Sequence, residues 1–250
     1  MVKSSLRKLA QITGFYIKPR RFTPLSSENY RTVKILETLN INKVLDVGAN
    51  EGQFAISLID YGYTKGIVSF EPASLSHNVL REKAVKFDSW QIADRTALGD
   101  REGSIKLNIS QDSQFNSIKK IRPNFTEQFK QSKVEGQEEV SITKLDSLKD
   151  KYYDDSENIF LKIDTQGFEK EILTGATDLL KKALAIKIEI PLHFIYNEVD
   201  WGIVEIFNFF DQNGFGCGSL SEISASKWSG LVQEVDGIFI RKELIQGFVK

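Results

Sequence analysis

The sequence predicts an α/β fold in which a mostly parallel sheet is covered by helices on both faces. Short apolar runs alternate along the chain with stretches of helical periodicity, as in parallel strands joined by helical crossovers. The first apolar run passes into a glycine-containing turn, VLDVGANEGQF, where a strand gives way to a helix. With 250 residues, 41% of them hydrophobic, the chain can bury one large core, so we expect a single main domain.

The elements of this domain follow one another regularly. Ser26 or Ser27 is placed to cap a leading helix that turns Val33 and Leu36 inward and ends near Asn40. The expected strands of the main sheet cover residues 43–47, 66–70, 90–93, 159–163 and 184–190. The expected helices cover residues 53–61, 74–86, 167–181 and 201–213.

Other short runs fall outside this alternation. Residues 103–109 and 139–142 are expected to form a small antiparallel β addition around a polar loop, 111–117, which would wall or cover a site. Residues 215–220 and 237–241 are expected to form a final strand pair.

The composition excludes several classes of function. Lysine and arginine total 33 against 34 acids, so no global positive field would hold the chain on nucleic acid, and we expect no nucleic-acid partner. The single cysteine, Cys217, cannot form an internal disulfide, and the start lacks the pattern of a secretory signal. Both observations favour the cytoplasm. No apolar run approaches the roughly 20 residues that a transmembrane helix requires.

The N-terminal segment differs from the rest in charge. Residues 1–24 contain no acid, and their basic side chains are Lys3, Arg7, Lys8, Lys18, Arg20 and Arg21. Two alternatives stay open, an arm packed on the body and peripheral contact with an anionic membrane surface. We therefore divide the chain into an arm with its leading helix, 1–40, and a main domain, 41–245. The oligomeric state is open, with a homodimer among the alternatives.

The turn after the first strand discriminates between nucleotide ligands. It reads G-A-N-E-G, so Asn50 and Gln53 stand where a dinucleotide fingerprint needs its second and third glycines, and the Gly-Lys-Ser/Thr of a P-loop is missing. S-adenosylmethionine has no pyrophosphate and needs open backbone with negative charge nearby. Gly48 and Gly52 would open the backbone by removing Cβ atoms, and Asp46 would supply charge near the amine.

A second acid fits the same ligand. Glu71 ends the second strand, where a carboxylate accepts hydrogen bonds from ribose hydroxyls, a role shared with NAD enzymes. Each residue also has a purely structural alternative, namely a tight turn, a helix cap or an exposed strand-end acid. Their order along the chain favours a nucleoside-type ligand.

These motifs carry a family resemblance. VLDVGANEGQF, VSFEP, TALGD, TKLDSL, FLKIDTQGFEKEILTGA, IKIEI and VDGIFIRK resemble, in this order, the FkbM-type S-adenosylmethionine-dependent methyltransferases across residues 42–242. KIDTQGFE followed by ILTGA is the most specific part. The resemblance implies a Rossmann-like class I methyltransferase fold, with a mostly parallel seven-stranded sheet whose last strand is antiparallel. It also implies O-methylation of a hydroxyl on a sugar, glycan precursor or small metabolite.

The resemblance assigns roles by position. The residues that it places at the methionine end of the cofactor are Asp46, Gly48, Asn50 and Gly52. It places Glu71 at the ribose, and Thr96 and Ala97, within Arg95-Thr96-Ala97, beside the adenine. One position departs from the family pattern, because many members have an acid where this chain has Gln166, which hydrogen-bonds but carries no charge.

Three residues near strand ends are candidates for catalysis. His193 is the favoured base because its ordinary pKa of about 6.5 lets it accept a proton near neutrality, with a surface or hydrogen-bonded loop histidine as the structural alternative. Asp164 would face the sulfonium or orient the acceptor, with a helix cap as the structural alternative. Glu189 lies in an apolar strand, where an acid is costly without a partner, so it serves either the site or a pair with Lys187. The loop that follows adds the aromatic side chains of Tyr196 and Trp201, although Trp201 is expected to face a helix core rather than the acceptor.

Three further alternatives concern the reaction itself. A magnesium-dependent transfer would need another ligand besides Asp164 and Glu189, and the sequence offers no clear one, so we expect no metal. An NAD-dependent oxidoreductase is disfavoured by the glycine turn. A non-catalytic nucleoside-binding module of Rossmann type would keep the turn and lack transfer chemistry.

Overall fold

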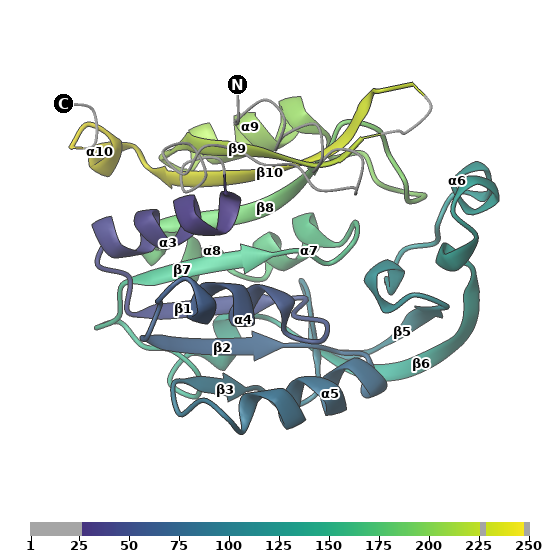
Figure 1. Ribbon diagram of the computed structural model, residues 1–250, viewed down its shortest axis with the longest axis horizontal. Coiled ribbons are helices and arrows are strands. Elements are labelled where there is room, and N and C mark those ends of the chain that lie inside the picture. Colours follow the sequence, from purple (N-terminus) through teal and green to yellow (C-terminus); the bar gives the residue numbers. More distant parts are fainter. Residues whose placement is uncertain (1–26, 226–228, 248–250) are drawn as a thin grey trace, which may run out of the picture.

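The computed structural model describes residues 27–225 and 229–247, and its main sheet has seven strands in the order β3-β2-β1-β7-β8-β10-β9 (Figure 1). These strands are β1 (Lys43–Val47), β2 (Gly66–Phe70), β3 (Trp90–Ile92), β7 (Ile159–Ile163), β8 (Ala185–Pro191), β9 (Phe215–Ala225) and β10 (Val232–Arg241). All neighbours pair in parallel except β10, which is antiparallel to both β8 and β9. The predicted class I methyltransferase sheet, with its reversed last strand, is confirmed.

Helices cover both faces of this sheet because strand side chains alternate between them. On one face pack α3 (Glu28–Thr38), α4 (Gln53–Asp60) and α5 (Ser74–Ala84). On the other face pack α7 (Glu169–Thr174), α8 (Thr177–Lys182) and α9 (Ile203–Gln212). Val44 and Leu45, neighbours on β1, are both fully buried but belong to different core clusters. Such burial on both faces explains why the strands are continuous apolar runs.

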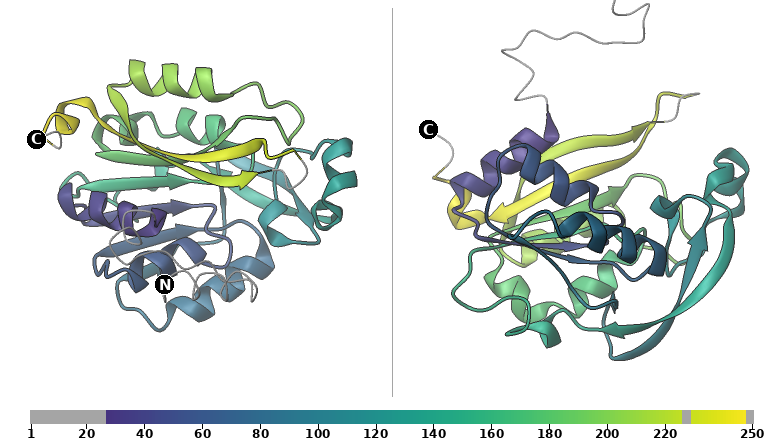
Figure 2. Two further views of the ribbon diagram at one scale, coloured as in Figure 1. Left: turned by 45° about the horizontal axis from the view of Figure 1, so that its top comes forward. Right: turned by 60° about the horizontal axis from the view of Figure 1, so that its bottom comes forward.

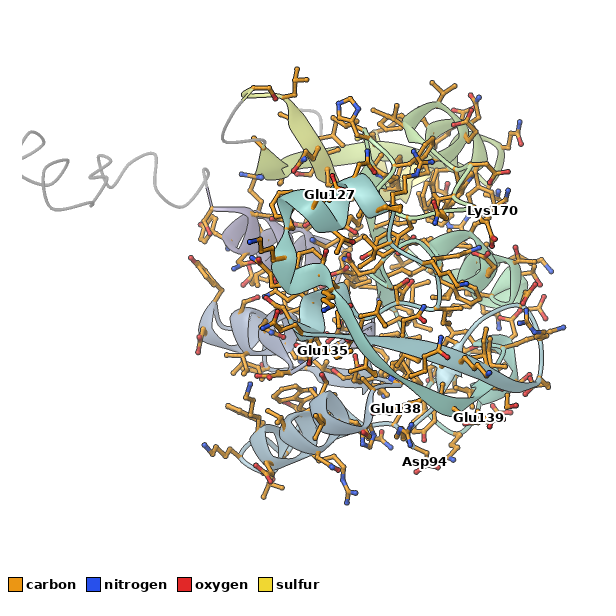
Figure 3. All side chains as sticks on the ribbon, turned by 90° about the vertical axis from the view of Figure 1, so that its right-hand side faces the viewer. Asp94, Glu127, Glu135, Glu138, Glu139 and Lys170 are labelled. Carbon is orange, nitrogen blue, oxygen red and sulfur yellow. The ribbon has the colours of Figure 1, made fainter. Side chains whose placement is uncertain are left out.

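A second, three-stranded sheet has the order β4-β6-β5, from β4 (Ala97–Leu98), β5 (Gly103–Ser110) and β6 (Val134–Thr143). With α6 (Pro123–Gln128) it projects beyond the carboxyl ends of the main strands (Figures 1 and 2). Glu138 of β6, labelled in Figure 3, fastens it to the main domain, accepting hydrogen bonds from the Ser74 amide at 3.0 Å and from Arg95 at 2.9 Å. The predicted small β addition is therefore present, and it flanks the edge where ligands bind.

One predicted helix, 167–181, is two helices. α7 ends at Thr174. At Gly175, which follows it, a Cβ atom would come within 1.9 Å of the Gly99 carbonyl oxygen, so the helix stops where two backbones touch. Asp146 then caps α8 by accepting hydrogen bonds from the amides of Asp178 and Leu179 at 2.9 and 3.0 Å. Neither contact is local in sequence, and periodicity alone did not reveal the break.

The remaining short elements are η1 (Ser113–Phe115), η2 (Lys130–Ser132), η3 (Asp146–Leu148) and α10 (Lys242–Ile245). Ser27 caps α3 as expected, its hydroxyl accepting from the Tyr30 amide at 3.4 Å. Across the described ranges, each helix is too short or too polar to span a bilayer. The basic segment 1–24 lies outside the described residues.

Candidate active site

A cavity of about 320 Å³ opens at the carboxyl ends of β1, β2, β7 and β8. Because of the strand order, one side lies over β1 to β3 and carries Gly48, Asn50 and Glu71; we call it the turn end. The other side lies over β7 and β8 and carries Asp164, Gln166 and Glu189; we call it the bridge end. Ser113, Gln114, Asn116 and Ser117, from the polar loop beside the small sheet, complete the wall.

The two glycines of the turn are required for packing. Gly48 has φ +73°, and a Cβ atom there would lie 1.9 Å from the Asp164 carbonyl oxygen. Gly52 has φ +86°, and its Cβ atom would lie 2.5 Å from the Trp90 ring. Gly48 lines the cavity and Gly52 does not. Glycine is therefore needed at both positions for a reason other than the expected path for the ligand. Without Cβ atoms, the turn can approach β7 and the Trp90 ring.

Asp46 lies beneath the turn, outside the cavity lining, in a buried polar network. Its carboxylate lies 3.1 Å from the Lys162 ammonium and accepts a hydrogen bond from the Ser69 hydroxyl at 3.0 Å. Lys162 also donates to the Gly48 carbonyl at 2.8 Å. Burial alone would lower the pKa of Lys162, but the charges of Asp46 and Asp164 raise it, so the lysine is a cation at neutral pH. Asp46 thus fixes the turn through Lys162.

Glu71 holds the turn from the second strand. One carboxylate oxygen accepts the Asn50 amide at 2.8 Å, and the other accepts the Ala73 amide at 2.8 Å. Burial raises the pKa of Glu71 to about 7 despite these two bonds. The Asn50 side-chain oxygen, by contrast, is buried at the cavity and has no hydrogen-bond partner among residues 27–225 and 229–247. A buried, unpaired acceptor calls for a donor from a ligand.

The segment after β3 also reaches the cavity. Thr96 and Ala97 line it, and the Thr96 hydroxyl donates to the Ser141 carbonyl at 3.1 Å. Arg95 is turned away, donating to the Pro72 carbonyl at 2.8 Å. Two of the three residues that the resemblance placed beside adenine therefore lie at the turn end.

At the bridge end, one amide joins two carboxylates. The Gln166 side-chain nitrogen donates to Asp164 at 3.0 Å and to Glu189 at 3.1 Å. The Gln166 side-chain oxygen accepts from the buried Tyr196 hydroxyl at 2.7 Å. Burial, followed by the charge of Asp164, raises the pKa of Glu189 well above its ordinary value. A raised pKa makes the ionised form of this carboxyl group a stronger base.

The other predicted residues of this region lie elsewhere. His193 is exposed and does not line the cavity, although its backbone amide donates to the Gln233 carbonyl at 3.3 Å. Trp201 packs edge-on against Phe209 at 5.4 Å between ring centroids, in the helix core. The structure therefore brings Asp164 and Glu189 together and leaves His193 outside.

Two lysines were not assigned to the site from the sequence. Lys162 and Lys187 both line the cavity, and their ammonium groups each lie 5.8 Å from the centroid of the Phe54 ring. Lys187 does not pair with Glu189, as the structural alternative supposed, but with Glu28 at 2.9 Å and with Asp236. The sequence did contain a signal for these lysines, since each lies inside an apolar strand. A buried cation requires an acid beside it, so such a lysine indicates a buried ion pair.

Comparison with known proteins identifies the chain. A family model described as the methyltransferase FkbM domain matches residues 46–217. The chain belongs to the FkbM methyltransferase family. It is an S-adenosylmethionine-dependent methyltransferase, and this assignment removes the nicotinamide alternative. No curated protein matches the chain in sequence.

Solved structures show similarity to this FkbM methyltransferase at low identity. Magnesium protoporphyrin IX methyltransferase from Synechocystis, with bound S-adenosylmethionine, is 12% identical with a TM-score of 0.46, covering 96% of this chain and 97% of that one. A methyltransferase from Aquifex aeolicus is 14% identical with a TM-score of 0.42, covering 90% of this chain and 99% of that one.

Among the described residues, no three His, Cys, Asp or Glu side chains form a group that could hold a metal ion.

Proposed function

We propose that this enzyme methylates a hydroxyl of a sugar, glycan precursor or small metabolite. The observation that carries the proposal is the division of one cavity into two chemically different ends. The turn end presents Glu71 and the unpaired Asn50 oxygen, and the bridge end presents Glu189, a carboxylate with a raised pKa.

The turn end fits S-adenosylmethionine. The unpaired oxygen of Asn50 would accept from the donor's ammonium or hydroxyl groups, and the remaining lone pairs of Glu71 would accept from the ribose. Thr96 and Ala97 would border the adenine, while Asp46 acts indirectly by holding the turn through Lys162. When bound, the cofactor supplies a methyl group activated by a positively charged sulfur.

The bridge end fits a neutral hydroxyl. An aliphatic alcohol is far less acidic than a phenol, so its attack benefits from a base within hydrogen-bond reach. Glu189 takes this proton in our proposal, and Asp164 orients the acceptor. His193, which the sequence favoured, lies outside the cavity lining, so the geometry favours Glu189.

The polar loop supports an acceptor rich in hydroxyls. Its cavity-lining side chains, Ser113, Gln114, Asn116 and Ser117, are all uncharged donors and acceptors of hydrogen bonds. Both cavity lysines are already paired with acids, which leaves little attraction for a phosphate or carboxylate. This chemistry suits a neutral polyol.

The test is calorimetry with S-adenosylmethionine and its demethylated product, followed by transfer of labelled methyl groups to a panel of glycosides and small polyols. We expect micromolar binding that is lost in Gly48→Arg, and label on a hydroxyl oxygen. Absence of binding by the parent protein would refute the assignment of the turn end. Binding with label on nitrogen or carbon would refute O-methylation, and binding without transfer to any acceptor would favour the non-catalytic module.

A further inference from the structure

The Gln166 side chain occupies an unusual place between two acids. We propose that Gln166 is a positioning residue whose amide holds Asp164 and Glu189 at the bridge end as hydrogen-bond acceptors and thereby favours the ionised form of Glu189, the form that can take a proton. The inference rests on the proposed function, because it assigns a cause to the availability of the base.

The direction of the hydrogen bonds supports this role. A primary amide nitrogen carries two hydrogens, and here one lies toward Asp164 at 3.0 Å and the other toward Glu189 at 3.1 Å. The amide oxygen is occupied by the Tyr196 hydroxyl at 2.7 Å. Because both hydrogens are donated, the contacted oxygen of Glu189 acts as an acceptor, and this hydrogen bond favours the ionised form of Glu189.

The backbone of Gln166 is held in place for this purpose. Its φ is +60°, in the left-handed region that few residues other than glycine adopt. The buried carboxylate of Glu169 accepts from the amides of Thr165 at 2.9 Å and Gly167 at 3.2 Å, on either side of Gln166. The Ser117 hydroxyl donates to the Gln166 carbonyl at 2.6 Å. A strained residue held by several bonds is characteristic of functional sites.

The surrounding charges make a neutral bridge necessary. The groups that face Glu189 from the neighbouring elements are Asp164, Glu169, Glu234, Asp236 and the Tyr196 phenol. Lys187, its neighbour on β8, is engaged with Glu28 and Asp236. A carboxyl group at position 166 would place a third acid against Asp164 and Glu189. Carboxyl groups this close to one another are joined by a shared proton. The amide of Gln166 instead joins the two acids with its own two hydrogens.

Three variants separate the bridge from the charge and the backbone. Gln166→Glu keeps the side-chain length but replaces the donor with an acid. Gln166→Asn keeps the amide and tolerates a left-handed backbone, but it is one methylene too short to span both acids. Gln53→Glu, at an exposed position that lines the turn end of the same cavity, adds a carboxyl group without touching the bridge.

The measurement is the titration of Glu189 by NMR of protein carrying ¹³C-labelled glutamate, with the signal assigned by its loss in Glu189→Gln. We expect Gln166→Glu to raise the proton affinity of Glu189 at least tenfold and Gln166→Asn to raise it at least threefold. Gln53→Glu should change it less than threefold. Affinity for the demethylated cofactor should stay within twofold in Gln166→Asn, because that ligand is held at the turn end.

The outcomes separate the two proposals. Unchanged titration of Glu189 in both Gln166 variants would overturn the positioning role, as would an equal shift in Gln53→Glu, since charge alone would then explain it. Loss of cofactor binding in Gln166→Asn would reassign Gln166 to the fold of the site and would equally overturn it. Failure of the parent protein to bind any adenosyl ligand would refute the proposed function, whereas the titration would still report on the bridge.

Discussion

At the turn end of the cavity, charged side chains hold backbone groups, whereas at the bridge end side chains form hydrogen bonds with one another. Glu71 accepts two backbone amides, and Lys162 ties Asp46 to a turn carbonyl. Asp164, Gln166, Glu189 and Tyr196 instead form one network of side chains. The difference matches the two tasks that we propose, because the turn end holds the cofactor and the bridge end holds the methyl acceptor. A rigid turn suits the first, and exchangeable side chains suit the second.

The sharpest way to break the turn end is Lys162→Met. It leaves Asp46, which is fully buried, without its cation, and the loss of one partner from a buried pair costs roughly 3–5 kcal/mol. Urea unfolding would measure this loss. The exposed pair of Lys170 and Asp200 provides the matched control, and Lys170→Met should change the unfolding midpoint little. Equal effects of the two changes would contradict the supporting role of Lys162.

Gly48→Ala tests whether the turn needs glycine for packing. A Cβ atom there would overlap the Asp164 carbonyl, so strain and overpacking together should cost about 3 kcal/mol, and cofactor binding should be lost. Gly62→Ala has the same left-handed requirement, with φ +100°, but nothing lies within 4 Å of its Cβ atom. Its cost should be only about 1–2 kcal/mol, and binding should be retained. Similar losses in both variants would point to backbone strain alone.

Glu189→Gln probes the bridge end. Removal of a general base slows turnover by about 10²–10⁴, while the dissociation constant of the cofactor should change less than about twofold. His193→Ala, at an exposed position, should leave turnover within about twofold of the parent. The opposite pattern, with the histidine variant slow and the glutamine variant active, would restore His193 as the base.

The smallest expected effect is a pH dependence of cofactor affinity. The pKa of Glu71 is raised to about 7, so in the free protein its protonated form contributes stability that is present below pH 4.5 and is lost as pH rises through 7. Ribose hydroxyls donate to the ionised form, so affinity should rise with pH, about tenfold per unit below pH 7, and level off above it. Calorimetry between pH 5.5 and 8.5, with Glu71→Gln as a control, measures this, and the control should show no such slope.

The turn end was largely predictable from sequence, and the bridge end was not. The strand, the turn with Gly48 and the acid Glu71 follow one another along the chain, so local pattern placed them at one sheet edge. The bridge instead joins residues after β7 and β8, and its geometry depends on Glu169 and Ser117 holding Gln166 in a left-handed conformation. Sequence identified Asp164 and Glu189 as candidates, but it ranked the exposed His193 above them because intrinsic pKa was the only criterion available.

The reasons for individual residues were harder to predict than their positions. Gly52 and Gly48 were expected to make room for a ligand, yet their nearest neighbours are Trp90 and the Asp164 carbonyl, which lie far along the chain. Likewise Lys187 pairs with Glu28 of the leading helix, a contact that no periodicity could indicate. Tertiary neighbours determine such roles.

The connection between β5 and β6 is joined to the segment after β8 through its main chain. The Arg122 amide donates to the Ile195 carbonyl at 2.9 Å, and the Asn197 amide donates to the Lys120 carbonyl at 2.8 Å. Main-chain hydrogen bonds therefore join the connection between β5 and β6 to the segment that carries Tyr196. Hydrogen bonds between main-chain groups do not depend on which side chains the residues carry. Substitutions among the side chains of these two segments should therefore leave the course of both main chains unchanged.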